Sequence, residues 1–77
     1  MATGVSGQPD PRLLAFGNRV RELRTARRLS QEQLAHEAGL HRTVVGFIER
    51  GDREVGISKL WPLALALGVE VADLFTT

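Results

Sequence analysis

The stretch SQEQLAHEAGLHRTVVGFIERG, residues 30–51, decides the fold of this chain. Ser30, followed three residues later by Gln33, is a capping-box pattern that marks the start of a helix. Gly39 is the kind of residue that ends a helix, because glycine readily adopts the left-handed conformation of a C-terminal cap. These signals predict a short helix over about residues 31–38.

A second short helix is predicted directly after this turn, starting near His41 or Arg42 and ending at Arg50-Gly51. Two short helices joined by a tight glycine turn cross at a steep angle. Ala35 in the first helix lets the two approach closely. The second helix places its apolar residues toward the core and leaves four residues on its free face: Arg42, Thr43, Gly46 and Phe47.

The chain on either side predicts further helices and no strand. Asp10-Pro11 is a helix start signal, and apolar residues at helical spacing follow to about Arg28. Another helix is expected over 57–67, and residues 71–75 have room for one last turn or two. Pro62 lies near the first turn if Ser58 is the cap, whereas it kinks the helix if Gly56 is the cap.

Length and composition limit what this chain can be. The 77 residues allow one small domain, expected over 10–77, after a tail at 1–9 that reads as disordered. There is no cysteine, which excludes disulfides and thiolate metal sites. Neither a membrane span nor the charge order of a signal peptide is present, so a soluble cytoplasmic protein is expected.

The net charge of +1 conceals an uneven distribution along the chain. Residues 12–53 carry nine arginines against five acids, whereas residues 54–77 carry one lysine against three acids. A basic half beside an acidic half is typical of a protein that meets a polyanion with one end.

Metal-binding and catalytic patterns are absent from the sequence. His36-Glu37 opens like a zinc-protease motif, but that motif needs a second histidine four residues after the first, and position 40 is Leu. No nucleophile elbow, phosphate loop or paired-carboxylate pattern occurs. We therefore expect no enzyme activity, no metal, no cofactor and no small-molecule substrate.

Four strings, in this order and spacing, carry a resemblance to a known family: RVRELR (19–24), LSQEQLAHEAGL (29–40), RTVVGFIERG (42–51) and LALALGVEVADLF (63–75). Together they make the chain similar to the lambda-repressor-like helix-turn-helix family of Cro and phage repressors. The stretch HRTVVGFIERGDRE resembles the controller proteins of restriction–modification systems. The resemblance implies an all-α domain of five helices, whose second and third helices read double-stranded DNA.

The resemblance also implies roles for individual residues. The residues expected to contact base edges lie at the start and on the outer face of the third helix: His41, Arg42, Thr43, Gly46 and Phe47. Phosphate binding falls to Arg19, Arg21, Arg27, Arg28 and Gln31, although the arginines of the first helix also read as a solvated face. Arg24 and Glu49 are expected to form a structural ion pair, and Phe47 has a core or dimer contact as its alternative.

A homodimer is expected from the C-terminal half of the chain. Trp61 and Leu65 share one helical face, and not all the apolar residues there fit into so small a core. The predicted interface consists of Trp61, Leu65, Val69, Val71, Leu74 and Phe75, with Trp61 as a cap on the core as the alternative. A twofold dimer would bind a pseudo-palindromic operator.

A second function remains open on the sequence alone. The predicted reading helix is rich in apolar residues, which also suits a helix-turn-helix module that contacts protein, such as an antitoxin.

Overall fold

The computed structural model describes residues 9–76, which form four α-helices and two short 3₁₀ helices without a strand. The helices are α1 (Pro11–Ala26), α2 (Gln31–Ala38), α3 (Arg42–Arg50), η1 (Ile57–Lys59), α4 (Leu60–Leu67) and η2 (Val71–Phe75). The all-helical prediction is confirmed. The described residues contain four α-helices where the resemblance implies five helices, and the segment Val71–Phe75 is a 3₁₀ helix. The predicted tail lies outside the described residues except for Pro9.

Helix α1 begins where the sequence predicts it. The Asp10 carboxylate accepts a hydrogen bond from the Arg12 backbone N–H at 2.8 Å, and Pro11 occupies the first turn. The helix ends at Ala26, two residues short of the predicted Arg28. Arg28 has a φ of 60°, so a non-glycine residue takes the left-handed conformation that turns the chain toward α2.

The caps predicted for the two central helices are both present. The Ser30 hydroxyl accepts from the Gln33 backbone N–H, and the Gln33 side chain accepts in return from the Ser30 N–H. Gly39 and Gly51 end α2 and α3 at φ values of 69° and 70°. The lengths of α2 and α3 therefore follow directly from local sequence.

The helix predicted over 57–67 is divided in two. A 3₁₀ turn precedes α4, which starts only at Leu60, so Pro62 falls within the first turn of the α-helix. Proline costs little there, because first-turn N–H groups have no partner inside the helix. This placement removes the need for a kink.

Twelve buried apolar residues, contributed by all four α-helices and η2, form one core: Phe16, Val20, Leu34, Ala35, Ala38, Val45, Ile48, Leu63, Ala64, Ala66, Leu67 and Leu74. Helices α1 and α3 approach closely at Gly17. A Cβ at this position would overlap the Ile48 carbonyl oxygen and lie 2.7 Å from that of Glu49. Glycine is therefore required by packing, although it lowers helix propensity.

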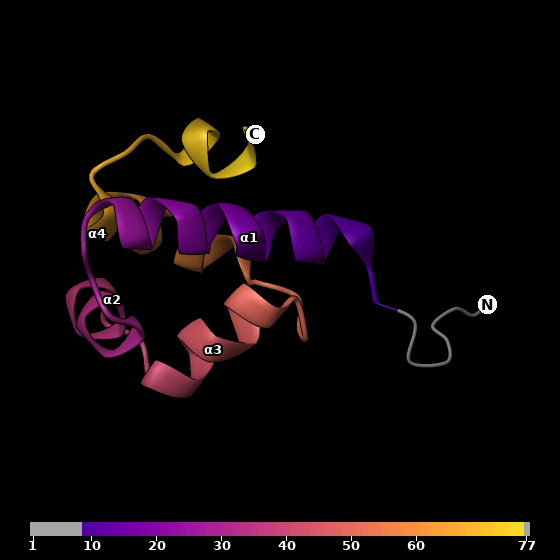
Figure 1. The fold of residues 1–77 in the computed structure, drawn as a ribbon, viewed down its shortest axis with the longest axis horizontal. Helices are drawn as coiled ribbons and strands as arrows, with labels where there is room; N and C mark the ends of the chain where they lie inside the picture. Colours follow the sequence, from indigo (N-terminus) through magenta and orange to yellow (C-terminus); the bar gives the residue numbers. More distant parts are fainter. Residues whose placement is uncertain (1–8, 77) are drawn as a thin grey trace.

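Figure 1 shows how these elements are arranged around α1. Helix α1 runs along the longest axis, with α3 on one side of it and the C-terminal η2 on the other. The free face of α3 therefore points away from the C-terminal segment. None of the helices in the described residues is long and apolar enough to cross a membrane.

Candidate nucleic-acid interface

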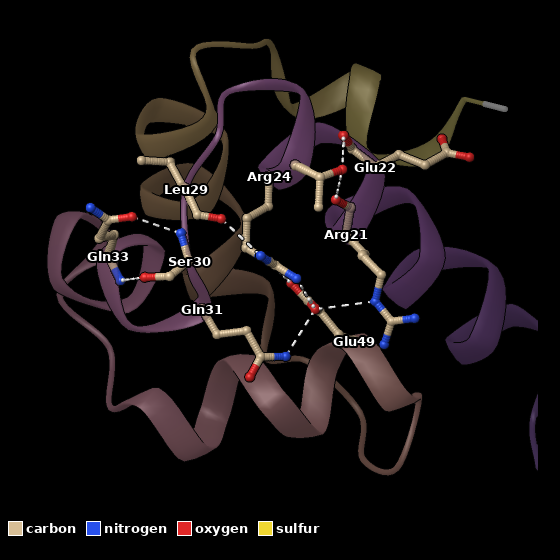
Figure 2. A network of polar contacts seen from close by, with 9 residues as sticks. Arg21, Glu22, Arg24, Leu29, Ser30, Gln31, Gln33 and Glu49 are labelled. Carbon is tan, nitrogen blue, oxygen red and sulfur yellow. Dashed lines mark hydrogen bonds and ion pairs between the residues drawn. The ribbon is translucent and has the colours of Figure 1, made fainter.

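Helix α3 is held against α1 and α2 through Glu49, which lies near its C-terminal end. The Glu49 carboxylate accepts hydrogen bonds from Arg24 Nε at 2.6 Å, Arg24 Nη2 at 3.0 Å, Gln31 Nε2 at 3.0 Å and Arg21 Nε at 3.4 Å. Figure 2 shows these donors converging on one carboxylate from two helices. The ion pair expected between Arg24 and Glu49 is present, and Arg24 also donates to the Leu29 carbonyl at 2.8 Å.

The environment of Glu49 fixes its charge. Only 2% of the residue is exposed. Burial by itself would raise the pKa, but the hydrogen bonds from Arg24, Gln31 and Arg21 outweigh it and bring the pKa of this carboxyl below its ordinary value. Charge-assisted bonds of this kind hold the orientation of a helix firmly. Helix α3 is thus positioned by polar contacts as well as by the core.

The start of α3 is exposed and capped by a histidine. His41 Nδ1 accepts a hydrogen bond from the Thr43 backbone N–H at 3.1 Å and lies 2.8 Å from the Thr43 hydroxyl. His41, Arg42 and Thr43 are all exposed. The structure therefore brings three of the five predicted base-reading residues together at one accessible helix end.

The other two predicted base-reading residues, Gly46 and Phe47, are covered. Gly46 is buried, because the Arg50 side chain lies over it with Nη1 3.1 Å from where a Cβ would stand. Phe47 is half-buried, with the guanidinium carbons of Arg53 and Arg50 at 4.3 Å and 5.4 Å from its ring centroid. A base contact by Gly46 stays a prediction, and it requires the Arg50 side chain to move aside.

Arg50 and Arg53 had no role in the sequence analysis. Arg50 follows Phe47 at a helical spacing of three residues, which is a usable signal for contact. Arg53 belongs to the loop after α3, where spacing predicts nothing about which side chains meet. Only the path of the loop places its guanidinium group over the ring.

Two of the predicted phosphate-binding arginines have other partners. Arg19 Nε donates to the Asp73 carbonyl at 2.8 Å, and Arg27 Nη1 donates to the Ala66 carbonyl at 2.8 Å. Arg19 ties α1 to η2, which lies on the opposite side of α1 from α3 in Figure 1, and Arg27 ties the end of α1 to α4. Arg19 and Arg27 therefore have partners within the chain, and the phosphate contact expected of each stays a prediction.

The remaining members of that predicted set lie elsewhere. Arg28 is exposed in the turn before α2, and the Arg21 side chain is 51% exposed although it reaches Glu49. Gln31 stands at the first position of α2, with its side-chain amide engaged by Glu49. Arg21 and Arg28 are therefore exposed members of the set that make no hydrogen bond to the C-terminal helices.

The residues predicted for a dimer interface do not all reach the surface. Trp61, Leu65 and Phe75 are 60%, 82% and 61% exposed, and Val69 and Val71 are half-buried. Leu74 is fully buried within the chain, so assigning it to the interface was wrong.

The sequence analysis also missed one residue of this apolar surface. Ile57 is 70% exposed and precedes Trp61 by four residues. The helical spacing that linked Trp61 to Leu65 would have found it, had the predicted helix been followed back to its start. Ile57, Trp61 and Leu65 are referred to below as the α4 stripe.

Comparison with known proteins identifies the family. A helix-turn-helix family model (HTH_3) matches residues 20–74. The control protein C.BamHI of Bacillus amyloliquefaciens is 46% identical over 67 residues, which make up 83% of each chain.

Two solved structures agree with this match. The restriction-modification controller protein C.AhdI from Aeromonas hydrophila aligns with a TM-score of 0.84 and 50% identity over 86% of this chain and 100% of its own. SinR, a master regulator for biofilm formation solved in complex with DNA, aligns with a TM-score of 0.75 and 27% identity over 79% of this chain and 98% of its own. The chain belongs to the helix-turn-helix family of Cro and phage-repressor type.

Proposed function

We propose that this chain is a sequence-specific transcriptional regulator that binds a pseudo-palindromic operator as a homodimer in the cytoplasm. The observation that carries the proposal is the exposed start of α3, on a helix whose orientation is fixed by the buried Glu49 network. A rigid helix with free polar side chains at its N-terminal end is the arrangement by which helix-turn-helix proteins read the major groove.

Each residue at the start of α3 offers a distinct contact. Arg42 can donate two hydrogen bonds to guanine O6 and N7, which discriminates against other bases by about 1–3 kcal/mol. Thr43 can bond a base edge or set its methyl against thymine. His41 uses Nδ1 as the helix cap, which leaves Nε2 for a base or a phosphate.

Phosphate contacts supply affinity without reading sequence. Arg21 and Arg28 are exposed beside the helix-turn-helix unit. The start of α2 at Gln31 offers backbone N–H groups at the positive end of the helix dipole, where anions bind. Because such contacts release counterions, the affinity for DNA falls steeply with salt.

The α4 stripe supports a twofold dimer. Three large apolar side chains, 60–82% exposed, stand on one face of η1 and α4. Isolated apolar residues are common on protein surfaces, whereas a contiguous stripe usually marks an interface. Phe75 lines a recess together with Ile57, and Val69 lines another together with Leu65. The stripe therefore suits a second copy that sets two α3 helices about 34 Å apart on DNA.

The relatives support the same conclusion. C.BamHI and C.AhdI are controllers of restriction–modification systems by their names, and SinR was solved on DNA. All three match most of this chain, and the family model spans α2 and α3. We propose residues 10–77 as the DNA-binding domain.

Selection of bound duplexes from a randomised pool, followed by sequencing, tests the proposal directly. We expect an enriched sequence with two related half-sites about one helical turn apart, and an affinity that falls with salt. The Arg42→Ala variant should fold normally by circular dichroism and lose about tenfold or more of its preference at one base pair per half-site.

Two outcomes would overturn the proposal. An Arg42→Ala variant that enriches the same sequence with equal affinity would remove the base-reading role from α3. A protein that enriches no sequence, yet copurifies with a stoichiometric protein partner, would favour the protein-interaction alternative such as an antitoxin.

A further inference from the structure

The ring of Phe47 lies beneath two cations. The Arg53 guanidinium carbon is 4.3 Å from the ring centroid and that of Arg50 is 5.4 Å away, both within the range of a cation–π contact. Phe47 comes from the middle of α3, Arg50 from its end, and Arg53 from the loop that follows. One aromatic side chain therefore organises two guanidinium groups beyond the helix end.

Gly46 makes room for this arrangement. The Arg50 Nη1 atom lies 3.1 Å from the place where a Cβ of Gly46 would stand. A larger residue on the same face would push the Arg50 head group aside. The glycine therefore lets the Arg50 side chain fold back along α3 beside the ring.

The two guanidinium groups differ in their remaining partners. Arg50 Nε donates to the Asp52 carboxylate at 2.7 Å, so its charge is balanced locally. Arg53 is exposed and makes no ion pair with another described residue. Stacking on a ring leaves the edge donors of a guanidinium group free. Arg53 is thus the cation of this pair that can bind an anionic acceptor.

Arg53 reaches back over α3, because its guanidinium group lies on the ring of Phe47 from that helix. One recess between α3 and the loop is lined by Val44 and Phe47 of α3, by the cations Arg53 and Lys59, and by the acid Glu54. This recess adjoins the helix that presents Arg42 and Thr43. A phosphate of a duplex seated along α3 would therefore come within reach of a loop guanidinium held on Phe47.

We propose that Phe47 is a positioning residue that holds Arg53 in place to bind a DNA phosphate, and is not itself a base-reading residue. The proposal rests on the proposed function and extends the DNA-binding surface from α3 into the loop at 51–56. The benefit is entropic, because a loop arginine that is already stacked loses less freedom when it binds. On this proposal, the apolar base contact predicted for Phe47 is replaced by a phosphate contact from Arg53, which the ring holds ready for binding.

Affinity measurements on the duplex selected by the wild-type protein, beside a random duplex, test this arrangement. Arg53→Ala should lower affinity about tenfold on both duplexes and reduce the slope of log affinity against log salt by about 1, as expected for one lost phosphate contact. Arg53→Lys keeps the charge but not the stacked plane, so it should recover only part of the loss.

Substitutions of Phe47 separate positioning from direct reading. Phe47→Tyr keeps a ring and should bind like the wild type, whereas Phe47→Leu keeps apolar bulk without the ring and should lose about threefold. The double variant Phe47→Leu/Arg53→Ala should bind no worse than Arg53→Ala alone, because the other stacked cation, Arg50, is paired with Asp52 and the ring acts on DNA through Arg53. Thermal unfolding of each variant checks that the fold is unchanged.

Several results would overturn the inference while the proposed function stands. They are a Phe47→Leu variant with wild-type affinity, losses that add in the double variant, and an altered preference at one base pair on changing Phe47, which is what contact with a thymine methyl predicts. A wild-type protein that selects no duplex at all would overturn the proposed function as well, so the two failures are distinguishable.

Discussion

At the scale of single residues, the positions that matter most for stability are those where packing or charge allows only one type of side chain. Gly17 and Glu49 meet at the contact between α1 and α3, where the glycine admits the backbone of α3 and the glutamate bonds back to Arg24. Sequence propensity marks Gly17 as a weak point of its helix, with a cost of up to ~1 kcal/mol against alanine. The structure reverses that assessment.

Gly17→Ala should destabilise the protein. The new Cβ would meet backbone oxygens of α3, with that of Glu49 at 2.7 Å, and backbone cannot move aside cheaply. We expect a loss of about 1–3 kcal/mol in the free energy of unfolding, measured by denaturant titration.

Gly46→Ala is the matched control for this substitution. Its Cβ would meet only the flexible end of the Arg50 side chain, so the gain in helix propensity, up to ~1 kcal/mol, should dominate. Equal effects of the two substitutions would show that the close approach of α1 and α3 is not what requires Gly17.

Glu49 should make stability depend on acid. Its pKa in the folded state lies below the ordinary value of 4.5, so the carboxylate stabilises the fold fully above about pH 5. That stabilisation is lost as the pH falls through the folded pKa, because the proton then binds the unfolded chain more readily than the folded one. Unfolding followed from pH 7 to pH 2 measures this loss.

Glu49→Gln isolates this contribution. The variant should be less stable at pH 7 by about 3 kcal/mol, because Arg24 keeps a buried charge without its partner. Its stability should also depend less on pH below about pH 5. Hydrogen bonds from Arg12 lower the pKa of Asp10 to about 2, and this second acid dependence is common to the variant and the wild type. A variant with the wild-type pH profile would contradict this account.

At the scale of elements, each helix of the DNA-binding unit owes its ends to a cap. Helix α2 has a complete capping box, and α3 has a histidine in place of the more usual Ser, Thr, Asp or Asn. The 3₁₀ turn before α4 has no side-chain cap, which agrees with a helix that begins only at Leu60. Caps therefore explain the bounds of the helices better than apolar periodicity does.

His41→Ala should weaken the start of α3. The Thr43 backbone N–H would lose its acceptor, and we expect a loss of about 1 kcal/mol in unfolding free energy. His41→Asn restores a good N-cap and should restore stability. If DNA affinity falls equally in both variants while only the alanine variant is less stable, the imidazole contacts DNA in addition to capping the helix.

At the scale of the whole molecule, charge and apolar surface are separated. The exposed start of α3 belongs to the basic half of the chain, whereas the α4 stripe is apolar and belongs to the acidic half. Arg19 bonds α1 to η2, and Arg27 bonds the end of α1 to α4. Separate faces allow one copy to bind DNA and another copy at the same time.

Leu65→Glu should dissociate the proposed dimer. Leu65 is 82% exposed in one chain, so the substitution leaves the fold of that chain intact while placing a charge in the interface. Sedimentation should show a monomer with unchanged helicity, and affinity for a full operator should fall toward that for one half-site. Asn18→Glu, at an exposed position of α1, is the control and should remain dimeric. A Leu65→Glu protein that sediments like the wild type would place the interface elsewhere.

The sequence by itself determined the features that act within one or two helical turns. The caps at Asp10 and Ser30 and the left-handed conformations of Gly39 and Gly51 follow from neighbouring residues, and they set where α1 begins, where α2 begins and ends, and where α3 ends. The pair of Arg24 and Glu49 was accessible through the family resemblance.

Only the tertiary structure decided which distant side chains meet. Arg19 and Arg27 donate hydrogen bonds to backbone carbonyls that are 54 and 39 residues away in the sequence. Leu74 is buried, and the Arg53 guanidinium group lies over the ring of Phe47. The physical reason is range. Caps and periodicity work through hydrogen bonds and side chains a few residues apart, whereas these contacts depend on how the helices pack and how a loop returns to them, which no local spacing encodes.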